Sequence, residues 1–178
     1  MAQIDDFKAN LLGGGARSNQ FRVTIVPPAG IAIGLDVSRT SFLCKSSSLP
    51  AIELGVVPLT YRGRTINIAG DRTSAAGSWE TTFYNDTDFM IRNALERWNN
   101  GINDFAENTG VSSMSDYATD LTVEQLDRDG TVLKSYIFRN SWPSTIAAIE
   151  LSSAEGTTIE EFACTWQYQH FEASGVNF

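Results

Sequence analysis

The stretch TIEEFACTWQYQHF, residues 158–171, decides the fold class of this chain. Its side chains alternate in character, and a period of two is typical of a β-strand with one buried and one solvated face. The buried face is expected to hold Phe162, Cys164, Trp166 and Tyr168, and the other face Glu161, Ala163, Thr165, Gln167 and Gln169. We therefore predict a long, two-faced strand over residues 158–171.

Other stretches show a similar alternation, bounded by turn residues. A hairpin is predicted over residues 55–69, with strands 55–61 and 64–69 joined by Arg62-Gly63. Pro58 has no N–H for a strand ladder, which places the first of these strands at an edge or a bulge. The remaining predicted strands are residues 21–25, 40–46, 79–84, 119–126, 131–139 and 145–151.

One clear helix is predicted over residues 86–100, with an apolar stripe of Ile91, Ala94, Leu95 and Trp98 at helical spacing. Residues 1–19 read as a flexible N-terminal arm with a glycine hinge, and residues 101–117 read as a long loop. Together these elements predict a single domain over residues 1–178. Its fold class is mainly β, a β-sandwich or incomplete barrel with one packed helix.

Composition excludes several classes of protein. The 178 residues are 42% hydrophobic and 19% charged, unlike a disordered chain, and no apolar run is long enough to span a bilayer. There is no charged start followed by an apolar segment, so we expect no secretory signal and no membrane partner. The net charge of −8 argues against binding nucleic acid through its phosphates.

The acidity is unevenly placed along the chain. Residues 1–100 hold ten Lys or Arg and nine Asp or Glu, whereas residues 101–178 hold three and twelve. The C-terminal strands are therefore expected to build either an ordinary solvated acidic surface or one specific acidic face.

The residue inventory gives no support for catalysis. The single histidine, His170, lies in a strand pattern with no nucleophile nearby in sequence, and Cys44 and Cys164 lack metal-site spacing. We interpret both cysteines as buried free thiols, which fits a reducing compartment. Neither an enzyme activity, a cofactor nor a metal site is expected.

Five short segments, in order, resemble the tail tube proteins of contractile-tailed, T-even-like bacteriophages. They are ARSNQFRV at 16–23, LCKSSSLP at 43–50, PLTYRGRTINIAGDRT at 58–73, Asn85-Asp86 before a helix that contains Trp98, and Trp142-Pro143. The resemblance extends from about residue 16 to about residue 170.

This resemblance implies a structural protein of the virion tail, assembled in the bacterial host cytoplasm. Its copies would form hexameric rings that stack into a hollow tube, in which strands of all subunits join one inner barrel. Genome DNA would pass through without specific binding. The implied partners are further copies of the chain, a contractile sheath protein, the baseplate hub, the tail terminator and the tape measure protein.

The same resemblance implies which residues make subunit contacts. The candidates are Arg17, Asn19, Pro58, Tyr61, Arg64, Asn67, Asp71 and Arg72. Candidate channel-lining residues are Asp120, Thr122 and Glu124 on one strand and Glu161, Thr165 and Gln167 on the last. A one-residue shift in register would exchange the faces of either strand, so the lining face stays open.

Two alternatives to a phage tail tube remain at this stage. One is a tube subunit of a phage-derived contractile injection system, a use of the same fold. The other is a non-catalytic β-sandwich module that binds a ligand, such as a sugar, through exposed aromatic side chains such as Tyr61 and Tyr84.

Overall fold

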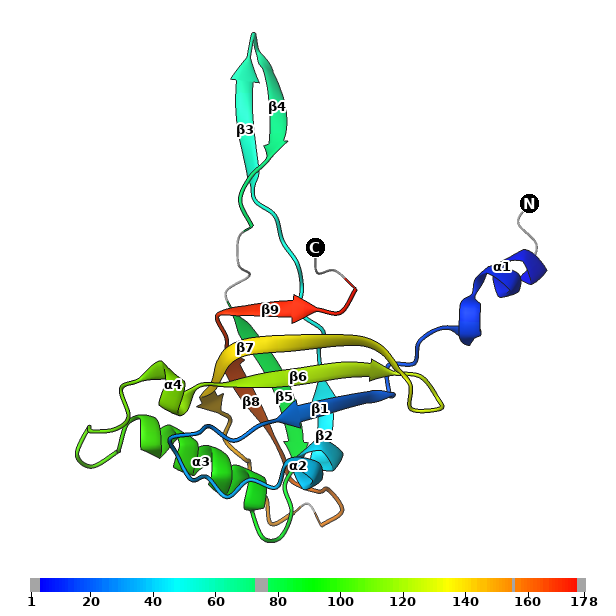
Figure 1. Cartoon of the computed structure of the whole chain (residues 1–178). Coiled ribbons are helices and arrows are strands. Elements are labelled where there is room, and N and C mark those ends of the chain that lie inside the picture. Colours follow the sequence, from blue (N-terminus) through cyan, green and yellow to red (C-terminus); the bar gives the residue numbers. More distant parts are fainter. Residues whose placement is uncertain (1–3, 73–76, 155, 176–178) are drawn as a thin grey trace.

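The computed structural model describes residues 4–72, 77–154 and 156–175. Figure 1 shows a compact body, from which a two-stranded hairpin and an N-terminal arm project in different directions. The helices are α1 (Ile4–Asn10), a short 3-10 helix (Leu12–Gly14), α2 (Val37–Leu43), α3 (Met90–Ile102) and α4 (Met114–Tyr117). The strands are β1 (Phe21–Ile25), β2 (Cys44–Ser47), β3 (Val56–Tyr61), β4 (Arg64–Ala69), β5 (Ser78–Tyr84), β6 (Thr119–Leu126), β7 (Val132–Ile146), β8 (Glu161–Gln167) and β9 (His170–Ala173).

The body is built on an open antiparallel sheet. Its strand order is β1-β6-β7-β8-β5-β2, with β9 paired to β7, while β3 and β4 form a separate two-stranded sheet. Strands make up 37% of the described residues and helices 20%, which confirms the mainly β class. The sheet is not closed, so β1 and β2 remain as the two ends of the strand order.

The core lies between two groups of strands. The first group is β1, β6, β9 and the start of β7, and the second, crossing behind it in Figure 1, is β2, β5, β8 and the end of β7. Trp79 of β5 stacks on Phe138 of β7 with ring centroids 4.5 Å apart. The ring of Trp98 in α3 meets Trp166 of β8 edge-on at 5.7 Å, so this helix closes the core.

The stretch that decides the fold class is two strands and not one. Phe162, Cys164 and Trp166 of β8 are buried as the alternation predicts. The strand ends at Gln167, because the backbone N–H of Tyr168 donates to Gly77 and the next N–H donates to Arg139. The chain thus leaves its β5 partner there, and β9 pairs with β7.

The predicted strand over residues 145–151 is wrong. β7 runs for 15 residues through Trp142-Pro143 to Ile146, with a register shift between Pro143 and Thr145. Asn140 adopts a left-handed φ of 51°, which lets the strand bend from its β6 partner to its β8 partner. A proline at an irregular part of a ladder costs little, since the N–H it lacks has no regular partner there.

The predicted strand over residues 40–46 is also wrong, because α2 occupies most of it. Asp36 caps this helix by accepting a hydrogen bond from the backbone N–H of Arg39 at 3.0 Å. Thr40 is buried, and its hydroxyl donates to the Asp36 carbonyl at 2.6 Å. The strand pattern therefore begins only at Cys44.

The long helix α3 starts and ends later than predicted. Residues 87–89 form a tight lead-in, where Phe89 has a φ of 53° and the Asp88 carboxylate accepts from the N–H of Met90 at 3.1 Å. Gly101 lies inside the helix. A Cβ atom at this position would come within 2.7 Å of the Ile31 side chain, so only glycine fits there without a shift. The four predicted stripe residues of this helix are all buried.

The remaining segments contain short helices that the sequence patterns do not predict. The arm over residues 1–19 carries α1, which stands clear of the body in Figure 1, and the end of the 101–117 loop forms α4. The helix count for the described residues therefore exceeds the single one predicted. None of the helices in residues 4–72, 77–154 and 156–175 is long and apolar enough to cross a membrane.

Candidate assembly surfaces

The β3–β4 hairpin is the most exposed part of the sheet structure. Its six residue pairs run from Val56↔Ala69 to Tyr61↔Arg64, and every one of the twelve residues is exposed. The turn at Arg62-Gly63 has φ values of 49° and 77°, the two positive values that a type I′ turn requires. These strands match the hairpin predicted for residues 55–69.

Much of this hairpin surface is apolar. Six large apolar side chains are between 46% and 62% exposed, and the register places all of them but Val56 on one face of the ribbon: Val56, Val57, Leu59, Tyr61, Ile66 and Ile68. A two-stranded ribbon with no packed face is at best marginally stable in water. No described part of the same chain packs on the hairpin. Its apolar surface therefore needs cover from another molecule.

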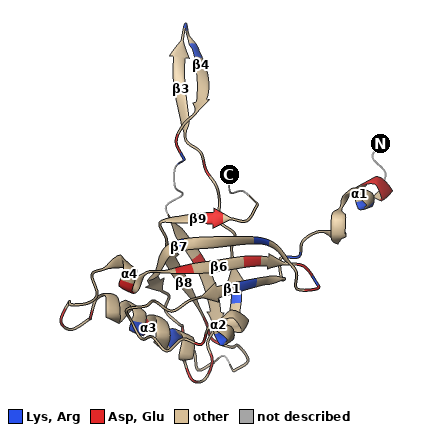
Figure 2. Ribbon diagram, in the orientation of Figure 1, with Lys and Arg blue, Asp and Glu red and all other residues tan. Residues whose placement is uncertain are grey.

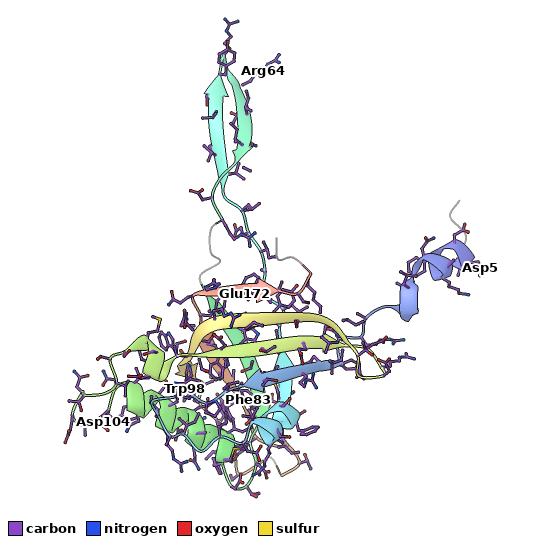
Figure 3. The ribbon with its side chains drawn as sticks, viewed as in Figure 1. Asp5, Arg64, Phe83, Trp98, Asp104 and Glu172 are labelled. Atoms are coloured by element: carbon purple, nitrogen blue, oxygen red, sulfur yellow. The ribbon has the colours of Figure 1, made fainter. Side chains whose placement is uncertain are left out.

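Six of the eight predicted contact residues belong to the hairpin or its base. Pro58 and Asn67 are paired across the ladder, and Tyr61 pairs with Arg64 beside the turn, at the tip labelled in Figure 3. The neighbouring Arg62 guanidinium lies over the Tyr61 ring at 5.3 Å. At the base, Asp71 and Arg72 follow β4, and the Asp71 carbonyl accepts from the N–H of Gly55.

The other two predicted contact residues lie elsewhere. Arg17 and Asn19 are exposed and precede β1, where the arm joins the body. The Arg17 carbonyl accepts a hydrogen bond from the Gln125 side chain at 2.7 Å, which fastens the arm to β6. The structure therefore does not bring these two residues to the hairpin, and two separate surfaces carry the predicted contacts.

The first set of predicted lining residues lies on the solvent side of β6. Here Glu124 pairs with Arg22 of β1 at 2.6 Å. Arg139 of β7 forms ion pairs with Asp120 at 2.6 Å and with Glu172 of β9 at 2.8 Å. Figure 2 shows both basic and acidic segments on these strands. The carboxylates of this face are thus matched by arginines from neighbouring strands. Thr122 lies between Asp120 and Glu124 on the same face.

The second set lies on β8 in the other group of strands. Its members Glu161, Thr165 and Gln167 point away from the buried face of Phe162, Cys164 and Trp166. Glu161 pairs with Lys45 of β2. Because each set lies on the solvent side of its own strand group with the core between them, the two sets do not share one surface.

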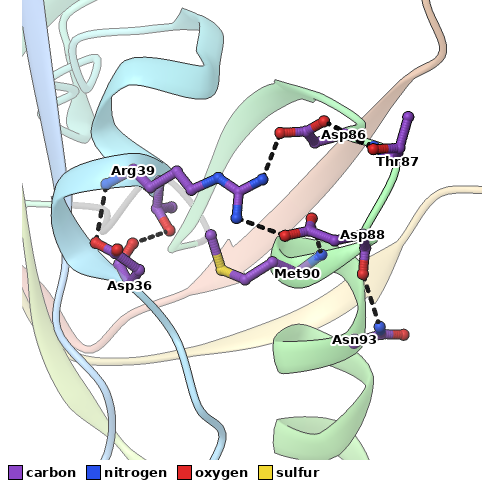
Figure 4. A network of polar contacts seen from close by, with 8 residues as sticks. Asp36, Arg39, Asp86, Thr87, Asp88, Met90 and Asn93 are labelled. Atoms are coloured by element: carbon purple, nitrogen blue, oxygen red, sulfur yellow. Dashed lines mark hydrogen bonds and ion pairs between the residues drawn. The ribbon is translucent and has the colours of Figure 1, made fainter.

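A cluster of charges joins α2 to the start of α3 (Figure 4). The Arg39 guanidinium donates to both Asp86 and Asp88, the latter at 2.5 Å. These hydrogen bonds are the main cause that lowers the pKa of each carboxyl below its ordinary value. The cluster fixes the lead-in to α3 and so orients the helix that closes the core.

Burial raises the pKa of both thiols, and the described residues hold no metal-binding cluster. Cys164 is buried, and burial raises its pKa. Cys44 is only partly buried, which corrects the expectation of two fully buried thiols, yet burial raises its pKa to about 12. No group of three or more metal-ligating side chains occurs in residues 4–72, 77–154 and 156–175.

A shared aromatic binding site does not form. Tyr61 lies at the tip of the hairpin, whereas Tyr84 ends β5 on the body, opposite Glu161. The Tyr84 ring faces the Lys45 ammonium at 5.7 Å. The two tyrosines offered for a ligand-binding module are therefore on separate surfaces.

Sequence patterns miss one surface feature altogether. A hollow of about 610 Å³ is lined by residues 148–153 and 158–161, in the segment between β7 and β8. The nearest signal in the sequence is the pair of apolar residues Leu151 and Ile159 among polar neighbours, and both are well exposed. An isolated apolar residue in a loop is common, so this signal does not identify a surface by itself.

Comparison with known proteins gives consistent matches across the chain. A family model described as "Phage tail tube protein" matches residues 16–174. The tail tube protein of Serratia phage KSP90 is 26% identical over 170 residues, covering 94% of this chain and 95% of that protein. Tail tube protein gp19 of Enterobacteria phage T4 is 29% identical over 171 residues, covering 95% and 99%.

Solved structures share the fold at lower sequence identity. A chain in the anti-feeding prophage tube-terminating cap aligns with a TM-score of 0.59 and 16% identity, covering 90% of this chain and 91% of that one. A chain in the sheath–tube complex of an extracellular contractile injection system, in its extended state, aligns with a TM-score of 0.58 and 13% identity, covering 95% and 97%. These matches show a common fold.

Proposed function

Because the chain belongs to the phage tail tube protein family and is a structural tail tube subunit, we propose that it forms hexameric rings which stack into a hollow conduit for DNA. The observation that carries the stacking is the uncovered hairpin β3–β4. Val57, Leu59, Tyr61, Ile66 and Ile68 share one exposed face of this ribbon, and an antiparallel sheet with one apolar face usually packs that face on other protein. A neighbouring subunit supplies that cover in the proposed assembly.

The open sheet supports joining of subunits within a ring. An open sheet leaves unpaired backbone groups at its edges, and closing the sheet across subunits satisfies them. The edge strand β1 follows Arg17 and Asn19, which makes these two residues candidates for the lateral contact. The hairpin residues Pro58, Tyr61 and Arg64 are candidates for the contact between rings. Asn67, Asp71 and Arg72 are candidates for the same inter-ring contact.

Only one of the two predicted lining sets can face the channel. The β6 set, Asp120, Thr122 and Glu124, is supported by its ion pairs with Arg22 and Arg139, which leave a polar face with little unpaired positive charge. Such a surface offers phosphates few free cations and so does not gain from counterion release. The β8 set, Glu161, Thr165 and Gln167, would then lie away from the channel.

The proposed role includes no catalysis and no cofactor. The raised pKa values of both thiols and the exposed position of the single histidine, His170, support this part of the proposal. The proposed partners are the sheath protein, baseplate hub, tail terminator and tape measure protein. In this proposal the chain is assembled in the bacterial cytoplasm and functions in the virion tail. A tube of a contractile injection system is the second candidate, since one of the solved structures that share the fold is a sheath–tube complex of such a system.

The proposal is tested by imaging the purified protein by electron microscopy across a range of concentration and salt. We expect hollow tubes with six subunits in each ring, and failure to form tubes even with a baseplate template would contradict it. Thr122→Cys and Thr165→Cys variants, treated in intact tubes with a maleimide polymer too bulky for the channel, distinguish the two faces. Protection of Thr122→Cys alone is the expected result.

A further inference from the structure

The hollow between β7 and β8 lies at the opposite end of the body from the hairpin. The hairpin leads into the Ser78 end of β5, whereas the Tyr84 end pairs with Glu161, which lines the hollow. The length of β5 separates the two ends by roughly 20 Å, at about 3.4 Å per residue. Figure 1 shows this arrangement, with the hairpin above the sheet and the segment between β7 and β8 below it.

The hollow and the hairpin tip are complementary in charge. Glu150, Glu160 and Glu161 line the hollow, and the tip carries Arg62 and Arg64. Among the described residues, neither Glu150 nor Arg64 has an opposite charge within 4.0 Å. Two exposed charges of opposite sign thus lack partners at the two ends of one molecule.

The two surfaces are also complementary in their apolar parts. Leu151 and Ile159 at the hollow are 80% and 66% exposed. The hairpin presents Leu59, Tyr61 and Ile66 close to its turn. A volume of about 610 Å³ is in the range of roughly 300–1,000 Å³ that holds a drug-sized ligand, so the hollow can take side chains of the tip.

We propose that the hollow lined by residues 148–153 and 158–161 receives the hairpin tip, residues 60–65, of a second copy of this chain in the next ring. In this contact Arg64 meets Glu150, and the apolar side chains of the tip cover Leu151 and Ile159. Because donor and acceptor lie at opposite ends, the contact is head-to-tail and repeats along an axis. This inference rests on the proposed tube function and names the partner surface of the hairpin.

A disulfide cross-link tests the contact in assembled tubes. Thr65→Cys and Ser153→Cys place thiols on the tip and at the hollow, both at exposed positions. Each subunit then has one donor and one acceptor, so oxidation is expected to give a ladder of covalent oligomers on a non-reducing gel. The control pair combines Thr65→Cys with Arg128→Cys in the β6–β7 turn and is expected to give no ladder.

A charge exchange tests the ion pair. Arg64→Glu and Glu150→Arg are each expected to shorten the tubes about tenfold, because reversing one charge puts like charges together at the contact. The double variant restores the attraction and is expected to recover the wild-type length. The control variant Arg128→Glu changes the net charge by the same amount as Arg64→Glu, but at a position away from the contact. It is expected to leave the tube length unchanged.

The outcomes separate this inference from the function on which it rests. Wild-type tubes without a ladder for the first cysteine pair, or a double charge variant no longer than either single variant, would overturn the docking and leave the tube function standing. Ladders for both cysteine pairs would equally overturn it, since they would show contact without a specific site. Absence of tubes from the wild-type protein would overturn both.

Discussion

The strands of the body and those of the hairpin use similar residues in opposite ways. In β5 the side chains of Trp79, Thr81 and Phe83 are buried, with polar neighbours between them. In β3 the alternate side chains Val57, Leu59 and Tyr61 share one face of the ribbon, and all of them are exposed. Both strands alternate, but the apolar face of β5 is covered within the chain whereas that of β3 is not, so we expect the cover of β3 to come from another chain.

Truncating a buried side chain of the body should have the largest effect on the stability of the subunit. Trp98 is fully buried, packs against Trp166 and donates its indole N–H to the Tyr117 carbonyl at 2.7 Å. We expect Trp98→Ala to lower the free energy of unfolding by about 3–5 kcal/mol, through lost packing and the cavity that remains. Urea unfolding of the unassembled subunit measures this, and a loss below about 1 kcal/mol would contradict a single core.

Removing one buried hydrogen bond is expected to cause a smaller loss in the free energy of unfolding. The indole N–H of Trp166 donates to the Thr81 hydroxyl at 2.8 Å, and both residues are buried. Thr81→Val keeps the shape but leaves that N–H without an acceptor, which costs about 1–3 kcal/mol. The matched control is Thr60→Val on the exposed hairpin, expected to stay within about 0.5 kcal/mol of wild type. Equal losses for the two variants would remove the distinction between body and hairpin.

Acid should weaken the body through the cluster at the start of α3. Hydrogen bonds from Arg39 lower the pKa values of Asp86 and Asp88 below the ordinary 3.8. The unfolded chain therefore takes up protons first as pH falls, so this stabilisation is present above pH 3.8 and is lost as pH drops through the lower, folded pKa values. Unfolding midpoints between pH 6 and pH 2 should fall less steeply for Arg39→Gln than for wild type. A parallel decline in both proteins would contradict this role of Arg39.

A substitution in the hairpin is expected to have the smallest effect on the stability of the subunit. The same substitution is expected to abolish tube assembly. Ile66 is 52% exposed and has no cover in the described chain. Ile66→Ser should change the free energy of unfolding by no more than about 0.5 kcal/mol. Sedimentation should nevertheless show subunits or rings in place of tubes. Normal tubes from this variant would show that the apolar hairpin surface is not a contact.

Periodic elements are the part of the fold that the sequence predicts well. The alternation around Trp166, the hairpin turn at Arg62-Gly63 and the helical stripe ending at Trp98 all describe local geometry, and the structure contains each of them. Resemblance adds the family, which the matches confirm.

The misses arise from single-residue effects and from one contact between distant residues. Asp36 converts a strand-like run into α2 through one capping contact, and Asn140 bends β7 so that it passes Pro143 and changes partner. Neither effect has a period that a pattern can detect. The pairing of Glu124 with Arg22, residues 102 positions apart, likewise turns an acidic strand into a charge-matched face. The acidic surplus of residues 101–178 is thus partly balanced by residues from the first half.

The opposite placement of hairpin and hollow has a consequence for length control. A polymer built from such subunits has two chemically different termini, one presenting only hairpins and the other only hollows. A factor that stops growth at the first terminus must offer an acceptor for an apolar, basic turn, whereas a factor that starts growth at the second must offer such a turn itself. In the proposed assembly the initiator and the terminator therefore bind different surfaces and need not resemble each other.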